Sequence, residues 1–224
     1  MSFANTLAIP PAAPYVHAAP EPALAWTGHN PVCAGWFELR PARVPRDARP
    51  VYDEDMDCII GYHRSFAAVA ASYDLAGDLA ALAECGADDG ATAAPLLVAG
   101  TLWQPRVRGM TRSGEEGEGL AAPATTLARL RERFIGLARQ PLHFTLAALA
   151  DMQEPERFVP LHILRLAIRC GTRLAAGGTA ATDAVRFIAP ITRRGAQAVL
   201  ELTLRPSDHT VLRVRTWPIA GATT

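Results

Sequence analysis

The chain has 224 residues, of which half are hydrophobic and a fifth are charged, and its 22 basic and 22 acidic side chains balance to a net charge of zero. Every one of the 22 basic side chains is an arginine, which excludes enzymes that need a lysine for a Schiff base, a general base or a P-loop. No apolar run is long enough for a transmembrane helix, and the N-terminus lacks the basic and apolar regions of a signal peptide. We therefore expect a cytoplasmic protein with no membrane partner.

The charge is distributed unevenly along the chain. Residues 1–90 hold five arginines and twelve acidic residues, a balance of −7, whereas residues 91–224 hold seventeen arginines and ten acidic residues, a balance of +7. Such asymmetry indicates an anionic partner for the basic half. The alternative is that the two halves pair with each other inside one fold.

The N-terminal residues 1–31 contain six prolines, which rule out a regular helix or a central strand and predict an extended arm. The acidic part, 32–120, is predicted to be mainly helical, because apolar residues recur at helical spacing over 59–83. Residues 96–103 are predicted to form a buried strand. The glycine-rich stretch 106–119 is predicted to be a surface loop, since its glycines do not match a dinucleotide-binding fingerprint.

Four carboxylates lie close together at the start of this acidic part: Asp53, Glu54, Asp55 and Asp57. The segment lacks the ligand spacing and the glycine of an EF-hand loop, so we predict a solvated acidic loop and no metal site. Docking of this loop onto the arginine-rich half is the alternative that bears on function.

The C-terminal part, 121–224, is predicted to contain helices over 125–140 and 157–176, followed by three antiparallel strands. We place these strands at 184–191, 196–205 and 209–217. The sequence thus predicts an α+β fold with a proline-rich arm, a helical middle and a C-terminal helix packed on an antiparallel sheet of three or more strands. The parts 32–120 and 121–224 form either two domains or one.

Arginines in this C-terminal part are the leading candidate site. Arg165, Arg169 and Arg173 follow at i+4 spacing on the predicted helix, with no acidic residue on that helix to offset their repulsion. The candidates on the sheet and its turns are Arg193, Arg194, Arg205, Arg213 and Arg215. Arginine forks suit phosphate groups, and exposed aromatic side chains for base stacking are scarce, so contact with a backbone is expected.

A second candidate site surrounds the start of the 157–176 helix, where Glu154, Glu156 and His162 could act as acid or base. The order of strand, helix and meander resembles that of hot-dog enzymes that act on acyl thioesters, such as dehydratases and thioesterases. The resemblance concerns the fold alone, and the positions carry no family motif.

The sequence therefore predicts a non-catalytic binding or assembly protein without cofactor or metal. Its Arg-rich face would engage an anionic partner, either a nucleic-acid backbone within a ribonucleoprotein or other complex, or an acidic protein surface. The alternatives are a hot-dog-type enzyme and a structural component of a homo-oligomeric assembly.

Overall fold

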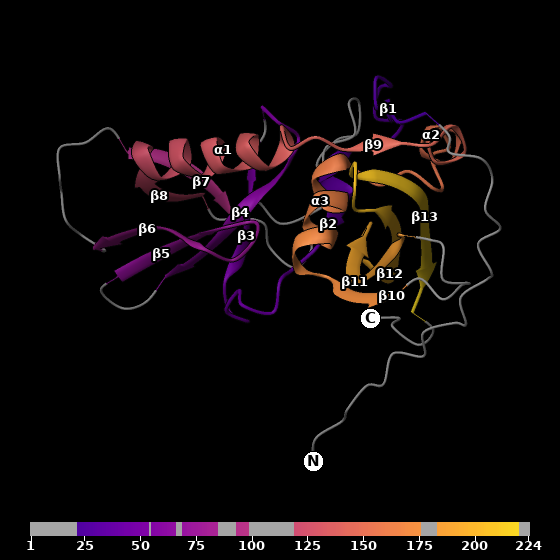
Figure 1. Ribbon diagram of the computed structural model, residues 1–224. Helices are drawn as coiled ribbons and strands as arrows, with labels where there is room; N and C mark the ends of the chain where they lie inside the picture. The colour runs from indigo at the N-terminus through magenta and orange to yellow at the C-terminus, as the bar shows by residue number, and fades with distance from the viewer. Residues whose placement is uncertain are drawn as a thin grey trace, which may run out of the picture.

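The computed structural model describes residues 22–53, 55–65, 69–84, 93–98, 119–175 and 183–219. Within these residues, thirteen strands form two sheets, and three α-helices pack against them (Figure 1). Most of the predicted arm and of the predicted glycine-rich loop lies outside the described residues.

One sheet is formed by the acidic part of the chain and has six antiparallel strands in the order β6-β5-β4-β3-β7-β8. Its strands are β3 (Arg49–Asp53), β4 (Cys58–Ser65), β5 (Val69–Asp74), β6 (Leu79–Glu84), β7 (Ala93–Val98) and β8 (Gly119–Pro123). The helix α1 (Ala124–Ala138) packs against this sheet and contacts five of its strands.

The predicted helical middle is wrong, because residues 58–84 form the three strands β4, β5 and β6. Alanine favours helices in isolation, but pairing between neighbouring strands overrides so weak a preference. The residues around Gly77, inside the predicted helical stretch, form the tight β5–β6 turn, in which Gly77 has a φ of +84°. The fold is therefore dominated by sheets and is not the predicted arrangement.

The second sheet has seven strands, with the path β1-β9-β13-β12-β11-β10 and β2 paired to β11. Its strands are β1 (Leu24–Ala25), β2 (Phe37–Glu38), β9 (His143–Phe144), β10 (Thr172–Ala175), β11 (Val185–Arg193), β12 (Ala196–Arg205) and β13 (Thr210–Pro218). The meander β11–β13 contains the three predicted strands, including the hairpin that turns at Pro206. The short strand β9 joins β13 in parallel.

Two helices belong to this second sheet. The helix α2 (Leu146–Gln153) begins at Thr145, whose hydroxyl accepts a hydrogen bond from the Ala148 amide at 3.2 Å, and it packs on β13. The helix α3 (Leu161–Cys170) packs on β11 and β12 and also contacts α1. It ends six residues before the predicted boundary, because the chain turns at Gly171 and continues as β10.

The core is continuous between the two sheets. Its largest hydrophobic cluster joins Tyr62 and Leu75 from the first sheet to Leu164 of α3 and to Leu200 and Leu202 of the second sheet. One hydrophobic cluster therefore spans both the predicted acidic part and the predicted basic part. Among the described residues, no helix combines the length and apolar composition that crossing a membrane requires.

The approach of α1 to β4 gives a test of this packing. A Cβ atom at Gly61 would lie 2.5 Å from the Tyr73 carbonyl oxygen and 2.9 Å from Leu130 Cδ2, so Gly61→Ala has no space. We expect a loss of about 1–3 kcal/mol in the free energy of unfolding, measured by denaturant titration.

Gly136 on the exposed side of α1 is the matched control, because a Cβ atom there meets nothing within 4 Å. Gly136→Ala should raise the free energy of unfolding by about 1 kcal/mol, since alanine is the better helix former. Equal effects of the two substitutions would contradict the described packing of α1 on β4.

Candidate anion-binding site

The eight arginines predicted from the sequence do not form one surface. Arg165 is 8% exposed on α3, and its Nε donates a hydrogen bond at 2.7 Å to the carbonyl oxygen of Gln140, just beyond the end of α1. Burial lowers the pKa of this guanidinium. A cation at a helix C-terminus is favourable, so Arg165 stabilises the contact between α1 and α3 and is not offered to a partner.

The predicted arginine row is interrupted after Arg169. Arg169 is exposed in the last turn of α3, and its Nη2 forms an ion pair with Asp78 at 2.8 Å. Arg173 lies in β10, opposite Phe187 of β11, and not on the helix. The helical spacing of the three arginines therefore does not exist in the folded chain.

Arg193 and Arg194 at the β11–β12 turn are used to hold neighbouring segments. Arg193 donates to the carbonyl oxygens of Pro155 and Glu156, at 2.6 and 2.7 Å, and its pKa is lowered by burial. Arg194 stacks its guanidinium 4.1 Å from the centre of the Trp36 ring.

The hairpin arginines face a surface that is partly buried, contrary to the predicted wet face. Its centre holds an ion pair between Arg186 and Glu201 at 2.9 Å, and each residue is 8% exposed. Arg215 lies opposite Glu201 and is exposed, and Arg213 is half-buried. The sequence alone places Glu201 on the same face as these arginines, but it does not show that Glu201 is buried.

Arg205 is bound by its own turn. It pairs with Asp208 three residues later at 2.7 Å, and this hydrogen bond lowers the pKa of Asp208 to about 2. Of the eight predicted arginines, two form an ion pair within the described part of the chain, Arg169 and Arg205. Arg165 and Arg193 bind backbone carbonyl oxygens, and Arg194 stacks on Trp36.

The structure instead gathers a different set of arginines where the two sheets meet. We call this set the arginine band; it consists of Arg43, Arg129, Arg133 and Arg169. Asp78 pairs with Arg43 at 2.6 Å and with Arg169 at 2.8 Å. Arg133 of α1 pairs with Asp74 at 3.0 Å, and Arg129 lies one helical turn before Arg133. Segments that are far apart in the sequence thus supply one charged surface.

The β5–β6 turn fixes the two carboxylates of this surface. Asp74 Oδ1 accepts hydrogen bonds at 2.9 Å from the amides of Ala76 and Asp78, which leaves Asp74 Oδ2 for Arg133. Because the turn residues Asp74 and Asp78 were assigned to a helix, the sequence reasoning missed this site. The stretch D-L-A-G-D, with glycine between two aspartates, was the available signal.

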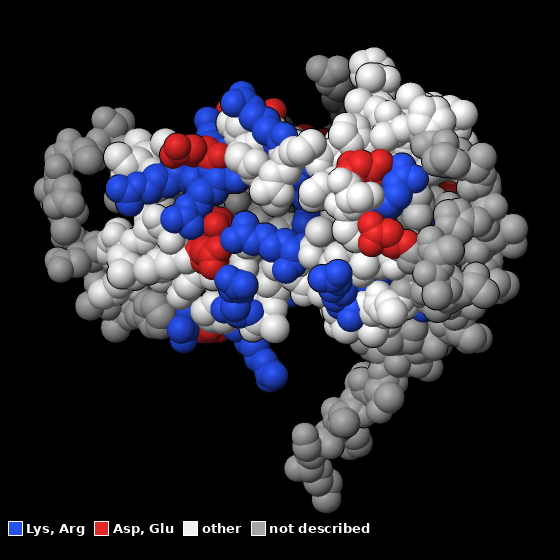
Figure 2. All heavy atoms as spheres, viewed as in Figure 1, with Lys and Arg blue, Asp and Glu red and all other residues white. Residues whose placement is uncertain are grey.

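The arginine band is open to solvent and is net positive. The side chains of Arg43, Arg133 and Arg169 are 55, 40 and 47% exposed, and Arg129 is exposed as well. Four arginines against Asp74, Asp78 and Glu132, which is exposed on α1 three residues after Arg129, leave a charge of +1. Figure 2 shows arginine side chains gathered over α1 and over the junction between the two sheets.

The acidic loop is docked onto the basic half of the chain. Asp53 is 2% exposed and accepts two hydrogen bonds from Arg131 of α1, at 2.6 and 3.1 Å, and Asp55 binds the same guanidinium at 2.7 Å. For Asp53 and Asp55, the acidic half of the chain therefore pairs with the basic half, as the alternative interpretation of the sequence expects. Within the described residues, no group of histidine, cysteine, aspartate and glutamate side chains could hold a metal ion.

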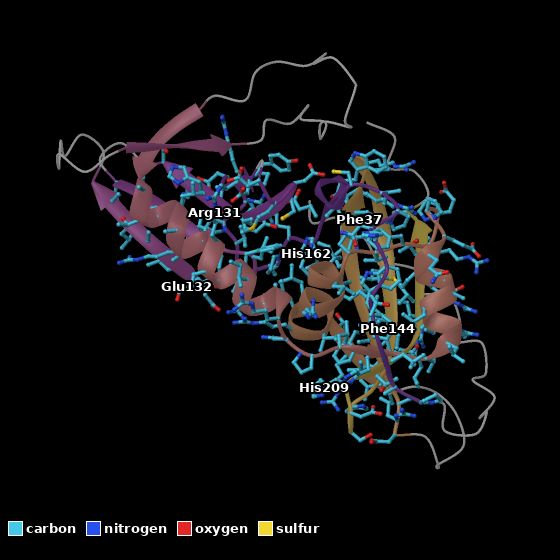
Figure 3. All side chains as sticks on the ribbon, turned by 90° about the horizontal axis from the view of Figure 1, so that it is seen from above. Phe37, Arg131, Glu132, Phe144, His162 and His209 are labelled. Atoms are coloured by element: carbon cyan, nitrogen blue, oxygen red, sulfur yellow. The ribbon has the colours of Figure 1, made fainter. Side chains whose placement is uncertain are left out.

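The candidate acid–base residues are placed in different surroundings. Glu154 is exposed and pairs with Arg157 at 3.2 Å, and Glu156 is exposed as well. His162 is 6% exposed on α3, with its ring centre 5.3 Å from that of Phe134 on α1 (Figure 3). Burial, and then the charge of Arg165, lower the pKa of His162 to about 4.

The three thiols among the described residues are not activated as nucleophiles. Cys33 donates a hydrogen bond to Asp57 Oδ2 at 2.9 Å, and Tyr52 donates to the other oxygen of the same carboxylate. Burial raises the pKa of Cys33 to about 12, and it also raises the pKa values of Cys58 and Cys170. Reactive cysteines need the opposite shift.

Comparison of the chain with protein-family models, with curated proteins and with solved structures found no match. A proposal about function therefore depends on the chemistry of the described surfaces alone.

The buried His162 predicts a pH-dependent stability. Its pKa of about 4 in the folded chain lies below the ordinary value of 6.5, so the unfolded state binds more protons between these values. The free energy of unfolding should fall by about 3 kcal/mol as the pH drops from 7 to 4, and His162→Leu should remove this contribution. Denaturant titrations over this pH range measure it.

The comparison between wild type and variant isolates His162. Burial also lowers the pKa of His63, but this side chain is present in both proteins and cancels in the difference. If both proteins lost stability in parallel between pH 6.5 and 4, His162 would not be buried uncharged.

Proposed function

We propose that this chain is a non-catalytic binding protein that engages an anionic partner through the arginine band. The observation that carries the proposal is the meeting of four exposed arginines from three separate segments around Asp74 and Asp78. Arginine is suited to such a surface, because its planar fork binds carboxylate and phosphate oxygens at two points. A cytoplasmic location, as expected from the sequence, is part of the proposal.

Two classes of partner share the required chemistry, and the embedded acids distinguish them. A nucleic-acid backbone would gain from the net positive charge but would also approach Asp74 and Asp78, which repel phosphates. An acidic protein surface can place its carboxylates beside the guanidinium groups and its own donors beside the two aspartates. The mixed pattern of charge thus favours an acidic protein surface, and nucleic acid is the competing outcome.

An acyl-thioester enzyme gains no support from the described residues. The proposed base, His162, is buried against Phe134, whereas Glu154 and Glu156 are exposed at the surface. We assign no catalytic role to these residues.

The proposal predicts that Arg129→Ala/Arg133→Ala/Arg169→Ala weakens binding to anionic polymers. Fluorescence anisotropy with labelled poly-glutamate and with a labelled single-stranded RNA oligonucleotide measures this. We expect at least about tenfold weaker binding to poly-glutamate and a flatter dependence on salt concentration, because the lost contacts no longer release counterions. Tighter binding of RNA than of poly-glutamate by the wild type would make nucleic acid the partner.

The matched control is Arg173→Ala/Arg213→Ala/Arg215→Ala, which removes the same charge from exposed or half-buried positions outside the arginine band. It should bind poly-glutamate within about twofold of the wild type, as changes to nonspecific charge alone are screened by salt. Equal weakening in both triple variants would mean that net charge and not the arginine band determines binding, and the proposal would fail.

A further inference from the structure

The strand β6 leaves an apolar edge of the first sheet open. It is the last strand on its side of the sheet and pairs, among the described strands, with β5 alone. Its sequence from Leu79 to Ala83, LAALA, contains no charged residue and no proline. Leu79 and Leu82 are 47 and 63% exposed, so two large apolar side chains of one strand lie in solvent.

The two leucines share one face of the sheet. Leu79 lies opposite Tyr73 and Leu82 opposite Ala71, and residues two apart on β5 point to the same side. The irregularity in pairing beside Tyr73 is what places two leucines three residues apart on one face.

This face is the one turned away from α1. A Cβ atom at Gly61 would meet Leu130 of α1, so the neighbouring Tyr62 points to the opposite side, and Tyr62 pairs with Tyr73. The two leucines therefore receive no cover from the helix that protects the other face.

The other sheet edges are protected in the ways common to monomeric proteins. The edge strand β8 ends at Pro123, β10 carries Arg173, and β1 has only two residues. Charge, proline and short length each discourage pairing with another chain. β6 has six residues and no proline, and its one charged residue, Glu84, is its last.

We propose that β6 pairs in an antiparallel manner with β6 of a second copy of this chain, so that two six-stranded sheets form one continuous sheet. An edge strand that no described strand covers is a template for pairing with another strand, and a second copy supplies one with the same exposed leucines. This interface lies outside the arginine band and does not depend on the proposed function.

The side chains select one register. Directly opposed residues of antiparallel strands point to the same face of the sheet. The two-fold axis that relates two copies of β6 therefore passes midway between one residue and the same residue of the second copy. We name each register by that residue. An axis at Leu82 sets Leu82 opposite Leu82 of the second copy and Ala81 opposite Ala83. An axis at Ala80 would instead oppose Asp78 and Leu82, a carboxylate and an apolar side chain.

The inference predicts that the purified full-length chain is a dimer and that Leu82→Arg makes it a monomer. Sedimentation equilibrium over a concentration series should show the dimer dissociation constant rising by at least about tenfold, because two arginines would face each other across the axis. Leu146→Arg is the matched control, since Leu146 is 60% exposed on α2, far from β6 in the sequence and on the other sheet, and it should leave the dimer intact. The triple variant of the arginine band should also remain dimeric.

A cysteine substitution tests the register without disturbing the fold through charge. Directly opposed Cβ atoms lie about 4.5–5.5 Å apart, close to the range that a disulfide spans, so Leu82→Cys should give a covalent dimer on mild oxidation with diamide. Leu146→Cys carries the same native cysteines and should stay uncrosslinked. A monomeric wild type, or equal crosslinking of the two cysteine variants, would overturn the inference.

Discussion

The burial of α3 between the two sheets is the constraint on which the rest of the structure depends. Six consecutive residues of this ten-residue helix, from His162 to Ala167, are buried, so no side of the helix is left to solvent over that stretch. A helix of this kind must be covered on all sides. The second sheet covers one side through β11 and β12, and α1 covers the other with Phe134. The two sheets are therefore held together by a shared core and not by a polar contact between finished domains.

Electrostatic pairing follows from that arrangement. Once α1 and α3 lie side by side, Arg131 reaches the acidic loop, Arg133 and Arg169 reach the β5–β6 turn, and Arg165 reaches the carbonyl end of α1. The ion pairs of Arg133 and Arg169 are exposed and add little stability individually, because water and salt screen them. Together these contacts determine the distribution of charge. Several arginines of the basic half bind partners within the chain, and the net positive charge that remains is concentrated in the arginine band.

The sequence predicted the second sheet better than the first, for a physical reason. In β12 and β13, bulky apolar residues alternate with polar ones, and this period of two is a direct signature of a strand. In β5 and β6 the buried residues are mostly alanines, so the period is faint and the helical preference of alanine prevails in the sequence reasoning. The predicted row of Arg165, Arg169 and Arg173 was wrong for another reason. These arginines are four residues apart in the sequence, but Gly171 ends the helix before Arg173, and only the fold shows that Arg165 is buried. The arginine band could not be predicted, because its members come from segments that tertiary packing alone brings together.

The alanine-rich strands β5 and β6, whose sequence suggests a helix, also form one edge of the first sheet. Among the described strands, no partner covers this edge at β6. Small side chains let α1 lie close to the inner face of the first sheet, with Leu130 against Gly61, and so they suit the packed side of the strands. At the edge, however, such residues offer neither the charge nor the bulk that discourages pairing with another chain. The leucines of β6 cannot turn inward, since the pairing with β5 fixes them on the face without a helix. A composition that serves the packing of α1 therefore creates, one strand further out, the edge at which we propose that a second copy pairs.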